Sequence, residues 1–63
     1  MCEANVYFID KEGNEKLLLE AVDTLVLSED GIVLENIFSE RKTIKARIKE
    51  MGLVEHRIVL EEI

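Results

Sequence analysis

The chain has 63 residues, 48% of them hydrophobic, with a net charge of −6, one cysteine and no proline. A domain of this size buries only about 60% of the surface that its unfolded chain exposes, so disulfides, metals or oligomerisation often assist folding. One cysteine cannot form an internal disulfide, and the sequence has no Cys and His cluster of the structural zinc type. These features predict a single domain over residues 1–63 that hides part of its apolar surface in a homodimer.

Charge and hydropathy argue against two classes of partner. Residues 1–40 hold ten acids and two bases, whereas residues 41–63 hold four acids and six bases. The overall field repels polyanions, so nucleic acid is a disfavoured partner. Charged residues between Asp10 and Lys16 interrupt any secretory signal, and no uncharged stretch approaches the ~20 residues that a membrane span needs. We therefore expect a cytoplasmic protein that does not associate with membranes.

Short stretches of alternating polarity, separated by turn residues, predict an all-β domain. Residues 3–9 are rich in β-formers and should form the first strand. Within it, Ala4, Val6 and Phe8 would share one face, because successive side chains in a strand alternate. Residues 10–14 then read as a hairpin loop that contains a glycine.

The next segment divides into three parts. Residues 17–19 form a brief second strand, residues 20–23 a corner, and residues 24–28 a third strand. The Asp30-Gly31 pair that follows is flanked by apolar residues on both sides. This is the strongest hairpin signal in the chain, and it predicts an antiparallel return.

The fourth strand is predicted over residues 32–37. Ile32, Leu34 and Asn36 alternate with the residues between them, so these three side chains should share a face. Residues 39–42 are polar and charged, and they are expected to form a bend.

Residues 41–51 fit two structures. Ile44, Ile48 and Met51 have helical spacing, but Ile44, Ala46 and Ile48 also alternate strictly with basic residues, as in a strand. No capping box opens a helix here, so we predict a strand. A turn at Gly52 and a last strand at 55–60 complete six short strands, which suggest a small antiparallel β-barrel.

The residue types give little support for catalysis. His56 is the only histidine, and in a predicted strand it more often has a structural role than a functional one. The chain lacks a Gly-rich phosphate loop and the groups of an oxyanion hole. We therefore expect that the protein is not an enzyme.

A basic stretch gives the alternative function, an RNA-binding surface of a small β-barrel. Its members are Arg41, Lys42, Lys45, Arg47 and Lys49. RNA-binding barrels also need stacking aromatics, but Phe8 and Phe38 are expected to pack in the core, which leaves Tyr7. A solvated basic face is the favoured interpretation.

Cys2 is the strongest candidate for a functional residue, because a thiol next to a chain end is poorly placed to fill a core. Its thiolate can bind a metal together with a nearby backbone or terminal nitrogen, a set that suits Ni(II), Cu or Zn(II). Two ligands are too few for a stable site. A two-fold axis near the N-termini would supply two sulfurs and two nitrogens, which suit Ni(II) or Cu(II) better than Zn(II).

Several short motifs recur in the order and chain length of a known family. They are Met1-Cys2, Val6-Tyr7, Leu34-Glu35-Asn36-Ile37-Phe38-Ser39-Glu40, Ile48-Lys49-Glu50 and Glu55-His56-Arg57-Ile58-Val59-Leu60. The chain resembles the CooT family of small nickel-binding proteins. The resemblance implies a dimer of small β-barrels, with the cysteine after Met1 as the nickel ligand.

The resemblance further implies a carrier or store of Ni(II), or an accessory role in maturing carbon monoxide dehydrogenase. Its partners would then be a second copy and a nickel enzyme or its maturation factors. Some relatives carry a predicted RNA-binding label, which the acidic charge here does not support. The client enzyme, the physiological metal and the role of His56 stay open. So does the ligand nitrogen, which is the amine of Cys2 if Met1 is removed and its amide if Met1 stays.

Overall fold

A computed structural model describes residues 3–63, which form six strands and no helix. In chain order the strands are β1 (Ala4–Ile9), β2 (Glu15–Ser28), β3 (Gly31–Asn36), β4 (Arg41–Ile44), β5 (Ala46–Gly52) and β6 (Arg57–Glu62). The predicted all-β class and the number of strands are therefore confirmed. In this part of the chain, no helix is long and apolar enough to cross a membrane.

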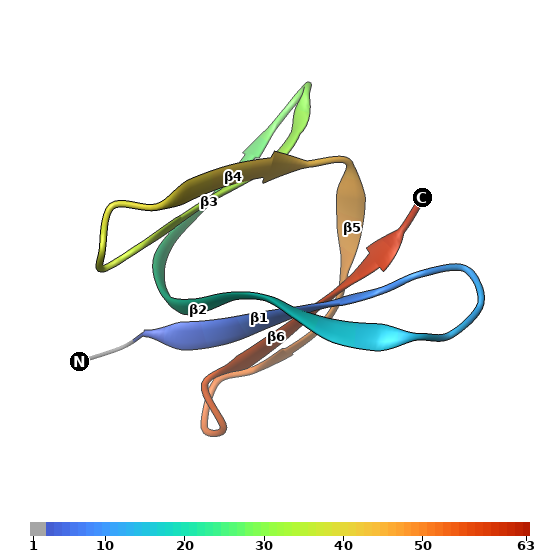
Figure 1. Cartoon of the computed structure of the whole chain (residues 1–63), viewed down its shortest axis with the longest axis horizontal. Coiled ribbons are helices and arrows are strands. Elements are labelled where there is room, and N and C mark those ends of the chain that lie inside the picture. Colours follow the sequence, from blue (N-terminus) through green and yellow to red (C-terminus); the bar gives the residue numbers. More distant parts are fainter. Residues whose placement is uncertain (1–2) are drawn as a thin grey trace.

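The six strands belong to one sheet in the order β4-β3-β2-β1-β6-β5 (Figure 1). The prediction of a purely antiparallel barrel is wrong in two respects. β1 and β6 pair in parallel, which makes the sheet mixed. β4 and β5 are its two edges, so the sheet is not closed.

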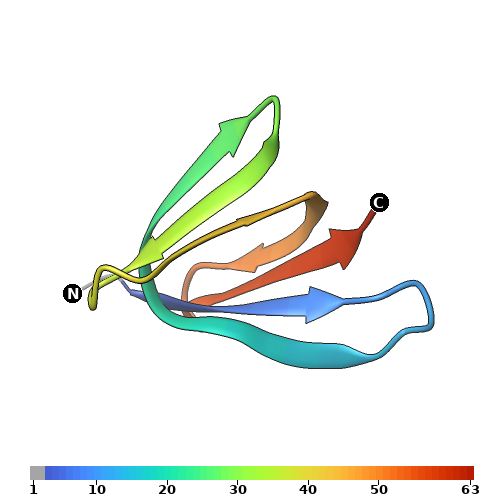
Figure 2. The same ribbon diagram turned by 45° about the horizontal axis from the view of Figure 1, so that its top comes forward.

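The sheet is strongly curled, and β5 contacts β3 across the curl (Figure 2). A single residue, Lys45, separates β4 from β5. The chain turns there and crosses to the far edge, where β5 pairs with β6 instead of with β4. Because β4 and β5 do not pair with each other, the curled sheet stays open between these two edge strands.

β2 replaces two predicted strands and the corner between them. Its first half pairs with β1 and its second half with β3, with a register shift between Val22 and Thr24. Ala21 has a left-handed backbone (φ 58°), and its N–H donates to Oδ1 of Asn5 at 3.2 Å. The corner therefore exists as an irregularity inside one strand, because β2 exchanges its partner β1 for β3 at Val22 without a break in pairing.

The ambiguous segment 41–51 is extended, as predicted, but it contains two strands. Ile44, Ala46 and Ile48 all face the core despite the break at Lys45.

The predicted bend at 39–42 is too long, because β4 already begins at Arg41. The last strand begins at residue 57, so Glu55 and His56 lie in the turn before it and not in the strand.

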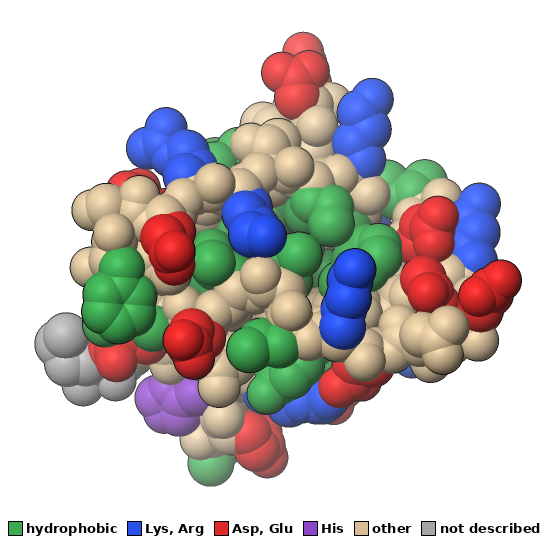
Figure 3. All heavy atoms as spheres, in the orientation of Figure 1, with side chains coloured by type: hydrophobic (Ala, Val, Ile, Leu, Met, Phe, Trp, Pro, Cys, Tyr) green, Lys and Arg blue, Asp and Glu red, His purple; other side chains and the backbone are tan. Residues whose placement is uncertain are grey.

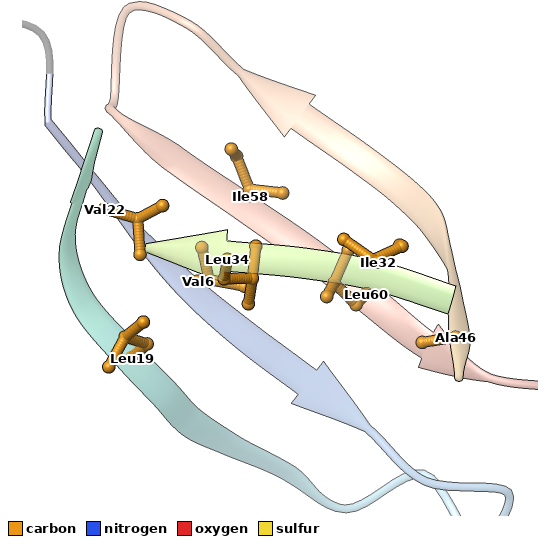
Figure 4. Packing of buried hydrophobic residues seen from close by; sticks show 8 residues of the cluster. All are labelled: Val6, Leu19, Val22, Ile32, Leu34, Ala46, Ile58 and Leu60. Atoms are coloured by element: carbon orange, nitrogen blue, oxygen red, sulfur yellow. The ribbon is translucent and has the colours of Figure 1, made fainter. Parts of the chain in front are cut away.

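The core fills the concave side of the sheet (Figure 4). Val6, Leu34 and Leu60 are fully buried at its centre, and Phe8 packs against this cluster as predicted. Asn36 shares the inward face of β3 with Ile32 and is only 2% exposed. The other members of the cluster are Leu19, Val22, Ala46 and Ile58.

Candidate metal centre

The predicted metal ligand, Cys2, lies outside the described residues, so the candidate site is defined by the residues next to it. Residues 3–5 lead into β1. On one side, Ala4 pairs with Val22 of β2, and Val22 in turn pairs with Asn36 of β3. On the other side, Asn5 pairs with Arg57 of β6. Residues 3–5 thus lie between the turn at 36–40 and the turn at 53–56. We call residues 3–5 together with these two turns the N-terminal end.

His56 is bound to the N-terminal segment at two points. Its Nδ1 lies 2.9 Å from the carbonyl oxygen of Glu3, and its own carbonyl accepts the N–H of Asn5 at 2.9 Å. A carbonyl only accepts, so Nδ1 is the donor in this bond. The side chain is exposed (Figure 3). His56 is thus not a strand residue with a side chain in the fold, but a turn residue that faces solvent.

The backbone of His56 is left-handed, with φ at 55°. Residues other than glycine adopt this region infrequently, although His, Asn and Asp do so more often than most. The two hydrogen bonds to residues 3 and 5 hold the conformation. A strained residue kept in place by its surroundings is an observation from which a functional role can be argued.

A cavity of about 360 Å³ opens beside His56. Its wall is largely apolar, and its polar members are Asp23, Thr24 and His56. The Thr24 hydroxyl donates to Oδ1 of Asp23 at 3.0 Å. The apolar lining consists of Ala4, Val22, Leu25, Gly52, Leu53 and Ile58. A larger cavity, about 430 Å³, includes none of residues 3–5 and lies against Ile32, Ala46 and Ile48.

The turn at 36–40 is organised by the buried Asn36. Its Oδ1 accepts the backbone N–H groups of Phe38 and Glu40 at 3.0 and 2.9 Å. Its Nδ2 donates to the carbonyl of Glu20 at 3.2 Å and to Oε1 of Glu40 at 2.7 Å. These bonds fix a turn whose tip, Phe38, is 65% exposed. The prediction that Phe38 packs in the core is wrong, because it follows the end of β3 and projects from the turn.

Exposed apolar side chains occur on both sides of residues 3–5. Ile37 and Phe38 form the tip of one turn, and Leu53 and Val54 the tip of the other. Leu53 is 76% exposed and also lines the cavity beside His56. Apolar groups gathered at one end of a small molecule are typical of an interaction surface.

The donor atoms of the described part do not complete a metal site by themselves. Residues 3–63 contain no group of three or more His, Cys, Asp or Glu side chains that could hold an ion. Glu3 nevertheless has a buried carboxylate oxygen, Oε2, with no hydrogen-bond partner among the described residues. Such an oxygen is unusual, because buried polar atoms are normally satisfied. A metal at this end fits the donor set only if Cys2 and further ligands contribute.

Two of the five residues of the basic stretch pair with acidic side chains. Arg41 pairs with Glu35 at 3.4 Å, and Arg47 pairs with Glu61 at 3.3 Å. Basic and acidic side chains are interspersed on the face shown in Figure 3. Tyr7 is covered by the guanidinium of Arg57, which lies 4.7 Å from the ring centroid. Tyr7 is therefore not free to stack on a base.

The described part of the chain is a small curled β-sheet whose exposed apolar side chains gather at the turns beside residues 3–5. The chain belongs to the CooT family: the family described as CO dehydrogenase accessory protein CooT matches residues 1–61. This confirms the resemblance drawn from the sequence motifs. An accessory role also agrees with the prediction that the protein is not an enzyme.

Two relatives support the assignment. A crystal structure of a CooT from Carboxydothermus hydrogenoformans is similar to this chain with a TM-score of 0.90 and 50% sequence identity, over 98% of each chain. A protein of Methanothermobacter thermautotrophicus is 36% identical over 61 residues, which cover 97% of this chain and 89% of the relative. Sequence reasoning did not anticipate the contact between His56 and Glu3. No local signal reveals it, since 53 positions separate the two residues.

Proposed function

We propose that this protein binds Ni(II) as cargo through Cys2 and serves as a cytoplasmic carrier or store in the maturation of carbon monoxide dehydrogenase or a similar nickel enzyme. The observation that carries the proposal is membership of an accessory family of that enzyme, combined with a thiol at the second position. Soft thiolate ligands favour late transition metals over Mg(II) or Ca(II). The net charge of −6 adds a general attraction for cations.

The proposed site needs two copies of the chain. One thiolate and one nitrogen from a single chain leave the ion undercoordinated, whereas two chains related by a two-fold axis provide two of each. The exposed apolar tips at Phe38 and Leu53 support such a dimer, because they flank the residues that follow Cys2. Covering them with a second copy would remove apolar surface from water and bring the two N-terminal ends together.

Nickel titration of the apo protein tests the metal. We expect a thiolate-to-nickel absorption band that saturates at half an equivalent per chain, and Cys2→Ser should abolish the band. Native mass spectrometry of the same sample reports the state of Met1, the dimer and the bound ion together. The proposal is wrong if Cys2→Ser binds nickel as well as the wild type.

A pair of matched variants tests the interface. Phe38→Ser combined with Leu53→Ser should yield a monomer in sedimentation and weaken nickel binding, because the second set of ligands is lost. Leu27→Ser is the control, since Leu27 is 67% exposed on the hairpin between β2 and β3, away from the N-terminal end. A dimer that persists in the double variant, or one that dissociates equally in Leu27→Ser, would contradict this interface.

A further inference from the structure

We propose that the free edge of β5 binds an extended acidic segment of a partner protein. The segment adds a strand beside β5 and places an apolar side chain in the cavity of about 430 Å³. Its carboxylates face three lysines of the opening between β4 and β5, namely Lys42, Lys45 and Lys49. This surface lies outside the N-terminal end, and the inference does not depend on nickel binding.

The two edge strands have free backbone groups on one side. β4 and β5 each have a single neighbour, so the N–H and C=O groups on their other side pair with no strand of the described part. β5 is the longer edge, with seven residues against four in β4. Extended peptides add to such an edge by β-augmentation, in which main-chain hydrogen bonds provide affinity and pockets for alternate side chains provide specificity.

The cavity of about 430 Å³ supplies such a pocket beside the first half of β5. Ala46 and Ile48 line it from β5, and Ile32 lines it from β3, which β5 contacts across the curl. Leu27 and Ile63 border the same cavity and are 67% and 64% exposed. Alternate side chains of a strand point to one face, so a strand added to β5 can direct an apolar side chain into this cavity.

Charge determines the chemistry of the segment. Residues 1–40 hold ten acids and two bases, a net charge of −8, and repel an acidic segment. Lys42, Lys45 and Lys49 are exposed and make no salt bridge within residues 3–63. Lys49 is the extra residue of a bulge in β5, and bulges often redirect a side chain next to a functional site. An acidic segment is therefore attracted to the opening and repelled by most of the remaining surface.

The surroundings of the cavity favour a protein segment over other occupants. Figure 3 shows apolar side chains between β4 and β5 with basic side chains on either side. The residues that line the cavity include no aromatic side chain on which a base could stack. A second copy is disfavoured, because its free strand edges in the described part are again β4 and β5, and edge-to-edge pairing would bring lysines together.

Two features restrict the segment further. Glu29 and Asp30 border the cavity at the tip of the hairpin, so the part of the segment that reaches this tip should be uncharged. Lysines on an edge strand also prevent unwanted pairing of strands. That protective role needs only the charge, whereas the apolar cavity beside the same edge is accounted for by an occupant with an apolar side chain.

The first test uses the full chain and short synthetic peptides, one alternating glutamate with leucine and one alternating lysine with leucine. Binding of the glutamate peptide should shift the amide NMR signals of β5 and of residues 27–32, and should slow hydrogen exchange along β5. Its affinity should exceed that of the lysine peptide by about tenfold or more. Serine in place of leucine, or N-methylation of alternate peptide amides, should weaken binding, because the pocket contact or the main-chain hydrogen bonds are lost.

Matched charge reversals locate the surface. Lys45→Glu combined with Lys49→Glu should lower the affinity for the glutamate peptide by about tenfold or more. Lys11→Glu combined with Lys16→Glu is the control, because it changes the net charge by the same amount at exposed positions of the first hairpin. Equal losses in both pairs would show that only the net charge acts, and would overturn the inference.

Further outcomes separate this surface from the dimer interface. Phe38→Ser combined with Leu53→Ser should bind the glutamate peptide like the wild type, even where nickel binding is lost. No shift of the β5 signals at about 1 mM glutamate peptide, or shifts confined to the N-terminal end, would overturn the inference. So would shifts of these signals by oligouridylate in place of the peptide, which would identify nucleic acid as the occupant. Slower exchange along β5 with rising protein concentration alone would identify a second copy instead, and would overturn it equally.

Discussion

Two turns of this protein share one hydrogen-bond pattern, one at residues 10–14 and one at 36–40. In each, the first residue accepts backbone N–H groups two and four positions later through Oδ1, at 2.9 Å in both bonds of Asp10 and at 3.0 and 2.9 Å for Asn36. The first and fifth residues also bond through their backbones, and the fourth residue is left-handed, Gly13 in one turn and Ser39 in the other. Unrelated stretches of sequence thus reach one geometry because the side chain at the first position organises both.

The two turns differ in the burial of their organising residue. Asp10 belongs to an exposed loop and keeps its negative charge. Asn36 is 2% exposed, and its amide nitrogen donates to the carbonyl of Glu20 and the carboxylate of Glu40. A buried group between two acceptors must be a donor, so only the neutral amide satisfies this position.

The tips of the turns differ as well. Lys11 and Glu12 occupy the tip of the first turn, whereas Ile37 and Phe38 occupy the tip of the second. The hydrogen bonds that define the turn use none of these side chains, so an apolar tip is not required by its geometry. An exposed apolar tip at this place agrees with the proposed dimer interface.

Asn36→Asp should have the largest effect on stability. The new carboxylate would face the Glu20 carbonyl and the Glu40 carboxylate in a buried position, with no donor to replace the amide. We expect a loss of about 3 kcal/mol in the free energy of unfolding, measured by urea denaturation. Asp10→Asn, the reciprocal change in the exposed turn, is the control and should have a much smaller effect. Equal effects in the two turns would show that burial does not decide the choice of side chain.

Replacing the left-handed residue of either turn should change the stability of the protein less than Asn36→Asp does. Gly13→Ala should lower stability by about 1 kcal/mol through backbone strain alone, because a Cβ at this position would meet nothing within 4 Å. Ser39→Gly should raise stability by about 0.5 kcal/mol, since relief of strain is partly offset by the entropy of glycine. Thermal unfolding of both variants provides the comparison. A stabilising Gly13→Ala would mean that φ at this position is not constrained as the structure indicates.

The same turns show how far the sequence could predict the structure. The loop at 10–14 follows from Asp10 and Gly13, and the alternation of Ile44, Ala46 and Ile48 identifies a strand face. The parallel pairing of β1 with β6 has no local signal, because it joins residues more than 50 positions apart. The open sheet depends on where the chain turns at Lys45, which alternation does not encode. For the site, only Cys2 could be named from the sequence, since the bond between His56 and Glu3 exists only in the folded chain.

The smallest expected effect is the pH dependence of the stability that the first residue of each turn contributes. The pKa of Asp10 is lowered from its ordinary value of 3.8, chiefly by the hydrogen bond from the N–H of Asn14. A carboxyl whose folded pKa lies below its unfolded value stabilises the fold fully above the unfolded pKa, and this contribution is lost as the pH falls through the folded pKa. Asn36 does not titrate, so the side chain at the first position of the second turn loses no charge on acidification. Urea denaturation from neutral pH down to about pH 2 should therefore show a stability difference between wild type and Asp10→Asn that shrinks with acidification. A difference that stays constant over this range would mean that the charge of Asp10 contributes nothing, and that both turns depend on hydrogen-bond geometry alone.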